Sequence, residues 1–365
     1  MKSRTEIMNS IEFRKSQRNF NILKMLVKRH LKMIFADHMR MMYTLMVPVI
    51  IFIVYLLFLR EMEINAVENE LLRRNIDLTS TDGQALAGQI HSIIDCWMFS
   101  GLLSISALTI SLQTNALLVT DKENGVNRDF VSSPINKNIL IISYFIYNFL
   151  ITIFLTFIIW IVCLVTLGIY QGIGSYGDLG GFVLNARDIF TTIGITLFSC
   201  LLATLINTFI CLFINTEGTL ASVIAAFSAA AGFLMGAYMP ISLLKPEGIQ
   251  YLCALFPLTY ACALSRFGFL ATPFTRLGLF IEGHPSLIAG AIFDGKPVTG
   301  AEVISTVENS FGYKVNFFGA ASLGEGFSTL VVVVFIILFL GLNIAFAGRL
   351  AKLEKKPLFR KHNKN

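Results

Sequence analysis

Six long apolar stretches constrain this chain more than any other feature of its sequence. A helix needs about 20 apolar residues to cross the hydrocarbon core of a bilayer. Stretches suited to this task occur at residues 42–59, 93–119, 139–169, 189–214, 219–239 and 329–347. The composition agrees, because only 14% of the residues are charged, against about 25% in soluble domains. We therefore expect an all-α integral membrane protein with six transmembrane helices.

The distribution of positive charge predicts how these helices are oriented. Ten of the 29 Lys and Arg residues lie in residues 1–41, and seven lie in residues 349–365. The first loop, residues 60–92, has three basic residues against six acidic ones. Because basic flanks stay in the cytoplasm, we expect both termini to be cytoplasmic, which six spans allow. Positive charge beside apolar segments is also typical of membrane anchors, so we expect no nucleic-acid partner.

The segment before the first apolar stretch predicts an amphipathic helix over about residues 18–40. Lys24, Lys28 and Lys32 recur at intervals of four and share one face of such a helix. Apolar residues recur with helical spacing on another face, at Phe20, Leu23, Val27, Leu31 and Ile34. We expect this helix to lie in the inner headgroup plane, with its lysines toward anionic lipid. A plain polybasic anchor is the alternative.

The segment between the fifth and sixth stretches predicts two parts. Residues 249–270 are apolar but interrupted by Pro257 and Arg266, so we expect a re-entrant or interfacial helix pair. The following residues are rich in Gly and Pro and predict a small extracytoplasmic lobe. The expected division is therefore a cytoplasmic N-terminus, helices 1–5, the re-entrant pair with its lobe, helix 6 and a basic cytoplasmic tail, at residues 1–41, 42–239, 240–328, 329–348 and 349–365.

Motifs for enzyme chemistry give no support to a catalytic role. Residues 290–296 fit the phosphate-loop pattern G-x-x-x-x-G-K. A working loop has Ser or Thr after its Lys to bind magnesium, but Pro297 stands there and the segment is predicted to face outward. The chain has no H-E-x-x-H pair and no G-x-S-x-G elbow, which zinc proteases and α/β-hydrolases use. We expect no catalytic residue, no metal site and no bound cofactor.

Polar side chains inside two apolar stretches predict a transit route or a packing role. Gln113 and Asn115 lie in the second stretch, and Asn207 lies in the fourth. Polar groups are costly in a bilayer and therefore often mark a substrate path. They also form hydrogen bonds between helices, each worth about 0.6 kcal/mol on average. Both interpretations stay open for these residues.

The polar loop at residues 120–138 resembles the cytoplasmic loop of ABC-2-type permeases. The matching positions are Asp121, Glu123, Gly125, Arg128, Ser133 and Pro134. Residues 236–241 and 256–260 are similar to the end of the fifth helix and the re-entrant pair of that family. The basic amphipathic helix is a third match, so the resemblance covers nearly the whole chain.

This resemblance implies a half-transporter that works with other chains. The chain would pair with a second permease subunit, identical or related, and with two copies of an ABC ATP-binding subunit that bind ATP and Mg²⁺. The amphipathic helix and the positions Asp121, Glu123, Gly125, Arg128 and Pro134 would dock on those subunits. The family exports drugs, peptides or lipid-linked compounds across the bacterial plasma membrane. The acidic first outer loop and the longer segment 273–328 depart from the family pattern and leave the substrate class open.

Two other classes of function stay open beside this one. A membrane sensor or immunity protein would bind a ligand through its outer lobe without transport. A membrane-integral enzyme would need ionisable residues clustered at membrane depth. The candidates for such a cluster, Asp95 and the Arg187–Asp188 pair, lie close to predicted span boundaries.

Overall fold

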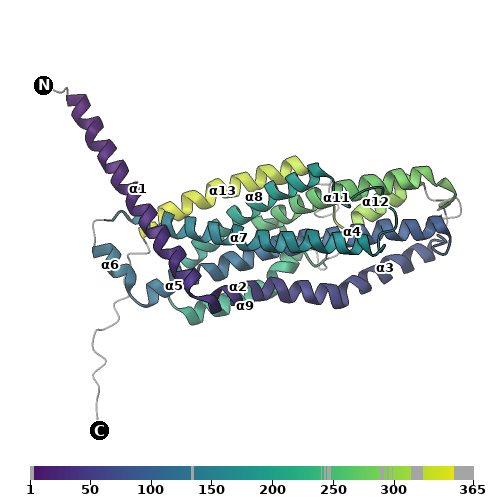
Figure 1. Ribbon diagram of the computed structural model, residues 1–365, viewed down its shortest axis with the longest axis horizontal. Helices are drawn as coiled ribbons and strands as arrows, with labels where there is room; N and C mark the ends of the chain where they lie inside the picture. The colour runs from purple at the N-terminus through teal and green to yellow at the C-terminus, as the bar shows by residue number, and fades with distance from the viewer. Residues whose placement is uncertain are drawn as a thin grey trace, which may run out of the picture.

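The protein is an elongated bundle of long helices (Figure 1). The computed structural model describes residues 4–132, 135–239, 241, 244, 248–287, 292–293, 296–297, 299–313 and 324–348. The helices are α1 (Arg4–Ala36), α2 (His38–Val54), the π-helix η1 (Tyr55–Leu59), α3 (Arg60–Arg73), α4 (Thr81–Thr114), α5 (Ala116–Glu123), α6 (Val126–Ser132), α7 (Lys137–Gly172), α8 (Ala186–Cys211), α9 (Glu217–Leu234), α10 (Gly248–Leu255), α11 (Pro257–Gly283), a 3₁₀ turn (Pro285–Leu287), α12 (Gly300–Ser310) and α13 (Glu325–Phe346).

The all-α prediction with six membrane-spanning helices is confirmed. Six helical segments are long and apolar enough to cross a bilayer, at His38–Arg73, Thr81–Glu123, Lys137–Gly172, Ala186–Cys211, Glu217–Leu234 and Glu325–Phe346. Among the described residues, the strands are the two-residue segments β1 (Ile292–Phe293) and β2 (Lys296–Pro297), which pair antiparallel. They form a local hairpin and contribute no layer to the fold.

The least apolar of the predicted spans forms the centre of the bundle. Helix α4 is buried along the whole of its most apolar 18-residue window and contacts α2, α7, α8, α9 and α11. Several of its hydroxyls are satisfied within the helix: Ser106 donates to the carbonyl of Leu102 at 2.6 Å, and Ser104 donates to that of Ser100 at 3.0 Å. Buried polar groups need such partners, so a polar sequence can occupy the core.

The first outer loop is a helical hairpin rather than an irregular segment. The first span continues through η1 and α3 to Arg73, and α4 already begins at Thr81, about 12 residues before the predicted start of the second span. Ile64 and Leu71 of α3 are buried against the outer part of α4, in the same core as Leu86 and Ile90. Because apolar residues recur on one face of α3 and of the first part of α4, both helices continue beyond the apolar stretches predicted to cross the bilayer.

Helix α9 ends at Leu234, earlier than the predicted end at Met239. Gly236 adopts a left-handed conformation with φ of 68°, which favours glycine and commonly ends a helix. The amide of Ala237 then donates to the carbonyl of Gly232 at 2.8 Å. A Cβ atom on Gly232 would lie 2.0 Å from the ring of Tyr238. Gly232 and Gly236 therefore serve packing and chain reversal within the chain.

The segment predicted as a re-entrant pair contains one sharp break. Helices α10 and α11 meet at an angle of 83°, at the junction between Phe256 and Pro257. Arg266 causes no break, and α11 continues past Pro273 to Gly283. Helix α11 packs against α4, α8 and α13 and is therefore a core helix. Helix α11 thus extends into the segment that was predicted to begin an extracytoplasmic lobe.

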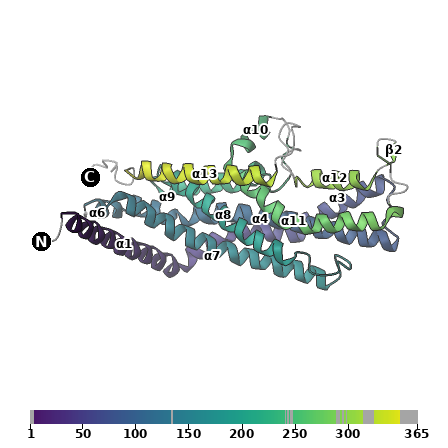
Figure 2. The ribbon, with the colours of Figure 1, turned by 90° about the horizontal axis from the view of Figure 1, so that it is seen from above.

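Two groups of elements lie at opposite ends of the bundle (Figures 1 and 2). Helices α1, α5 and α6 and the last residues of α13 gather at one end. Helices α3 and α12 and the last part of α11 gather at the other. The first group marks the α1 end of the bundle, and the second marks the α3 end.

Candidate functional site

The coupling residues predicted from the sequence fall at the α1 end, in a helical hairpin formed by α5 and α6. Gly125 turns the chain between these helices with φ of 75°, where L side chains are strained. Residues 120–138 were expected to form a short polar loop, but most of them are helical. The hairpin is anchored to the rest of the bundle by charged side chains.

Asp121 is the first of these anchors. Its carboxylate receives two hydrogen bonds from the guanidinium of Arg29, at 2.8 and 3.1 Å, and one from the hydroxyl of Tyr144, at 2.6 Å. The Asp121 side chain is only 3% exposed. Arg29 lies on α1, and its guanidinium also lies over the ring of Phe130 of α6, 5.3 Å from the centroid. This bidentate pair joins α1, α5, α6 and α7.

His30 lies next to this pair on the face of α1 that meets α7. Its ring stacks on Tyr144 with centroids 4.3 Å apart, and the side chain is fully buried. Burial, followed by the positive charge of Arg29, lowers the pKa of His30 from 6.5 to about 4. The imidazole is therefore neutral at physiological pH. The α1 end contains a titratable group whose protonation opposes the packing of α1.

Lys122 is the second anchor and lies at the carboxyl end of α8. Its ammonium donates to the carbonyls of Cys211 at 3.2 Å and Leu212 at 3.1 Å, and also to that of Ile214. The last carbonyls of a helix lack partners within the helix and carry partial negative charge. A lysine at this position therefore binds α5 to the end of α8.

Glu123 and Glu217 form the third anchor, at the start of α9. Glu123 accepts a hydrogen bond from the backbone amide of Glu217 at 2.7 Å, and Thr120 donates to the Glu217 carboxylate. Arg40 of α2 lies 4.0 Å from the same carboxylate. An acidic side chain at a helix N-terminus interacts favourably with the helix dipole. The α5–α6 hairpin is thus anchored to α1, α8 and α9 at once.

The comparison with protein families identifies the family to which this chain belongs. The family model of the ABC-2 type transporter matches residues 22–270, which include α5, α6 and all of the anchors described above. The chain belongs to the ABC-2 type transporter family. Comparisons with curated proteins and with solved structures gave no match. Membership makes the chain a multi-pass membrane permease of an ABC transporter, which associates with an ABC ATP-binding subunit.

The predicted docking residues of this permease differ in what they offer to a partner. Asp121 is buried and serves contacts within the chain, whereas Glu123 and Asn124 are exposed at the tip of the hairpin, and Asp129 of α6 is also exposed. Arg128 lies in α6, but its side chain lies outside the described part of the structure, as does Pro134. Docking by any of these residues remains a prediction.

The lysines of the predicted interfacial helix all lie on the surface of the permease. Lys24, Lys28 and Lys32 are exposed, while Leu26, His30 and Ile34 face the bundle at intervals of four. Phe20 was expected on the apolar face but is 65% exposed. Helix α1 starts at Arg4, well before the predicted boundary, and packs against α7. The buried face is therefore rotated from the one that the apolar pattern indicated.

Two of the three polar residues predicted to line a transit route form contacts between helices of the permease. Asn207 of α8 donates to the carbonyl of Leu108 in α4 at 2.9 Å. Asn115 faces Thr208 at 3.4 and 3.5 Å, and both side chains are fully buried. Gln113 is half-buried on α4. These contacts favour the packing interpretation for Asn115 and Asn207, and a role in transit remains a prediction.

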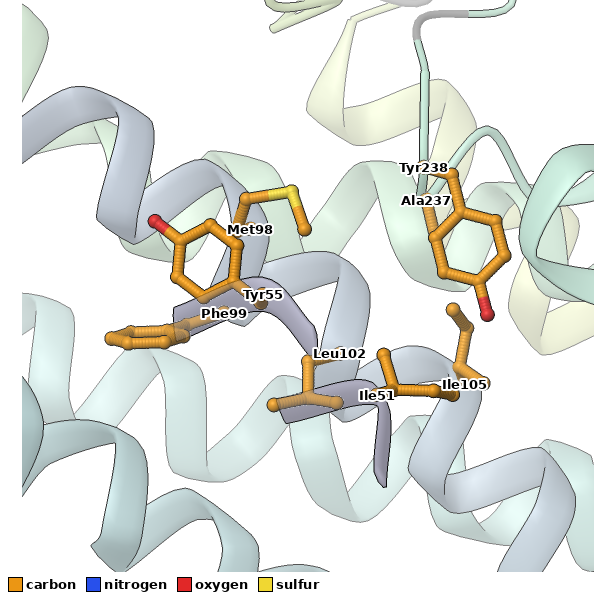
Figure 3. A pocket seen from close by; sticks show the side chains of 8 residues that line it. All are labelled: Ile51, Tyr55, Met98, Phe99, Leu102, Ile105, Ala237 and Tyr238. Carbon is orange, nitrogen blue, oxygen red and sulfur yellow. The ribbon is translucent and has the colours of Figure 1, made fainter. Parts of the chain in front are cut away.

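An apolar pocket lies between α2, α4 and the segment after α9. Figure 3 shows the ring of Tyr238 next to Ile51 and Ile105, with Tyr55, Met98 and Phe99 farther along. Its volume is about 10 Å³, which is enough for roughly one water molecule. In this conformation the pocket is too small for a substrate.

A buried charge cluster at the α3 end was missed by the sequence analysis. Asp95 of α4 is completely buried and receives hydrogen bonds from Arg60 at 3.0 Å and from Tyr176 at 2.6 Å, and also from Tyr55. The π-helix η1 separates Tyr55 from Arg60, and π-helical turns often occur at functional positions. Arg60 also lies over the ring of Tyr170, 4.1 Å from its centroid. An Asp beside a predicted boundary was the only sequence signal for this cluster.

Arg266 is a second buried cation in the permease, and its partners are backbone carbonyls. It is 2% exposed and donates to the carbonyl of Gly312 at 3.3 Å and to that of Gly236. Both carbonyls lie just beyond helix C-termini, those of α12 and α9. Because each helix end carries about half a negative charge, two such ends compensate one guanidinium. Arg266 also lies 5.5 Å from the ring centroid of Trp97.

Proposed function

We propose that this chain is the membrane-spanning subunit of an ATP-driven exporter of amphipathic compounds. Two copies of a separate ATP-binding subunit would bind ATP and Mg²⁺, so this chain would need no cofactor of its own. A second permease subunit, identical or related, would complete the transporter in the bacterial plasma membrane. The single observation that carries the proposal is the family match over residues 22–270.

We infer that the α5–α6 hairpin receives motion from the ATP-binding subunit. Its exposed tip, around Asn124, would contact that subunit, and its buried base transmits force through the Arg29–Asp121 pair. Exposed ion pairs contribute only about 0–1 kcal/mol each, so charges at the tip would set partner specificity. Lys24, Lys28 and Lys32 would contact anionic lipid or the same partner. Both termini and the hairpin would then be cytoplasmic.

Copurification tests this function directly. The tagged permease would be expressed with its neighbouring genes, solubilised in mild detergent and assayed for bound protein and for ATPase activity. We expect an ATP-binding subunit in about equal amount. Asp129→Lys in α6 should weaken its retention at least several-fold, because it reverses an exposed charge on the hairpin. Asp178→Lys, an exposed charge reversal in the loop after α7, is the matched control and should retain the subunit.

Two results would contradict the proposal in different ways. If the permease is expressed with its neighbouring genes but purifies alone and without ATPase activity, the result would favour a sensor or immunity protein. If both charge variants lose the ATP-binding subunit equally, the exporter assignment would be retained, but the hairpin would not be the docking site.

A further inference from the structure

An apolar cavity lies at the α3 end, between α3 and α12. Val67, Leu71 and Ile76 line it from the side of α3, and Val303, Val307 and Phe311 line it from the side of α12. Its volume is about 230 Å³. The floor residues Leu71, Ile76 and Phe311 are each less than 6% exposed. The cavity thus has a buried apolar floor and an open mouth.

The sequence predicts that the cavity lies beyond the hydrocarbon core of the bilayer. The apolar part of the first span ends at Leu59, and Arg60, Glu61 and Glu63 follow it. Ala66 at the mouth of the cavity is seven residues beyond Leu59, or about 10 Å along a helix. Bilayer lipid therefore does not surround this site. An apolar surface outside the membrane is a feature that needs an occupant.

The size of the cavity limits what it can hold. An apolar cavity of about 150 Å³ accepts a benzene ring, whereas pockets for drug-sized molecules measure about 300–1,000 Å³. A volume of about 230 Å³ therefore fits one ring or one short aliphatic chain. It does not fit a phospholipid with two chains.

The mouth and the floor suit an amphiphile with one apolar chain. Glu70 and Arg74 are the charged residues among those that line the cavity, and they form an ion pair at 3.0 Å. A polar headgroup at the mouth meets these charges while its chain enters the apolar interior. The floor is fixed, because Phe311 packs edge-on against Trp97 at 5.7 Å and Arg266 holds the neighbouring Gly312.

We propose that the cavity between α3 and α12 is a binding site for the apolar chain of a single-chain amphiphile on the α3 side of the membrane. This site goes beyond the proposed function, since binding does not depend on an ATP-binding subunit. A result against it therefore leaves the exporter assignment unchanged.

The tryptophans of the chain provide a local reporter. The chain has two of them, Trp97 and Trp160. Trp160→Phe leaves Trp97, which contacts the floor residue Phe311. This variant would be reconstituted in phosphatidylcholine nanodiscs and titrated with 11-bromoundecanoate, whose bromine quenches tryptophan only at contact range. A second sample would contain phosphatidylcholine brominated in one chain and no fatty acid.

We expect saturable quenching by bromoundecanoate and little quenching by the brominated phospholipid. Ala66→Phe at the mouth and Val303→Phe in the wall should each raise the half-quenching concentration at least ten-fold. Leu72→Phe is the matched control on α3: Leu72 is 50% exposed, is not among the lining residues, and its variant should bind like the parent.

Three results would overturn the proposal. Quenching that rises linearly and equally in all variants would show partition into the bilayer only. Unchanged binding in both Ala66→Phe and Val303→Phe would place the ligand elsewhere. Quenching by the brominated phospholipid that Ala66→Phe removes would show that membrane lipid fills the cavity instead.

Discussion

At the scale of single residues, the α1 end depends on a small number of buried charges. Asp121 has three hydrogen bonds from side chains of two other helices, so its removal leaves several donors without an acceptor. Unpaired buried groups cost more than the net gain of the bonds themselves. Because of this asymmetry, substitutions in the Arg29–Asp121 pair test whether α1 is anchored to the α5–α6 hairpin.

A double-mutant cycle measures the interaction energy between Arg29 and Asp121. Arg29→Met and Asp121→Asn should each lower the free energy of unfolding, and the cycle should give a coupling energy of about 1–3 kcal/mol. Unfolding would be followed in mixed micelles by loss of helical circular dichroism. The control pair Arg73 and Glu70 is exposed and 3.9 Å apart, and should couple by less than about 0.5 kcal/mol. Equal coupling in the two cycles would contradict the structure.

His30 predicts a pH dependence of stability. Its pKa is about 4 in the folded chain against 6.5 for the free side chain. Between these values the unfolded state binds more protons, so stability is full above about pH 6.5 and falls as the pH decreases toward 4. His30→Phe keeps a stacking ring and should flatten the melting temperature over this range. His38→Phe, at an exposed position on α2, should keep the slope of the parent.

At the scale of elements, the helices meet through polar contacts that the apolar pattern does not show. Helix α4 fills the centre although its sequence contains many polar residues, because several of its hydroxyls are bonded to its own carbonyls. Helix α1 packs with a face centred on His30 rather than on the residues with the clearest apolar spacing. In both helices the neighbouring helices select the buried face.

Arg266 joins three elements, and its removal should loosen all of them. Arg266→Met leaves the carbonyls of Gly236 and Gly312 without their donor, and should cost about 1–3 kcal/mol of unfolding free energy. Limited proteolysis after α12 should also become faster than in the parent protein. Arg187→Met removes an exposed arginine and should change stability by less than about 0.5 kcal/mol. A similar stability for both variants would mean that Arg266 does not hold these helix ends.

At the scale of the whole molecule, the two ends of the bundle should lie on opposite sides of the membrane. All six native cysteines are buried and free, so new surface cysteines can be labelled selectively with a membrane-impermeant maleimide. We expect Asn69→Cys in α3 to react in intact cells. Lys28→Cys in α1 and Asn124→Cys in the hairpin should react only after permeabilisation.

This labelling distinguishes an error in the predicted spans from an error in their orientation. If Asn69→Cys and Asn124→Cys react from the same side, the segment between them does not cross the membrane, and α4 is not a membrane span. The reverse of the expected pattern would keep the fold and invert its orientation.

Length and chemistry of local segments were enough to predict the class of this protein. Bilayer thickness sets the length of an apolar span, so the six spans follow from the sequence alone. The residues from Asp121 to Arg128 carried the family resemblance, and the family match over residues 22–270 confirmed it. These features are local, and a local pattern can be read without knowing which helices are neighbours.

Only the tertiary structure decided what each polar residue contacts. Asp121 and Arg29 are 92 positions apart, and Asn343 of α13 donates to the carbonyl of Leu205 in α8 across 138 positions. The cavity between α3 and α12 likewise needs walls from residues 66–76 and 303–311. Such contacts depend on how helices pack, and packing is a property of pairs of segments rather than of one. The sequence by itself therefore determined the membrane spans and the family, while the tertiary structure decided the anchors of the hairpin and the cavity between α3 and α12.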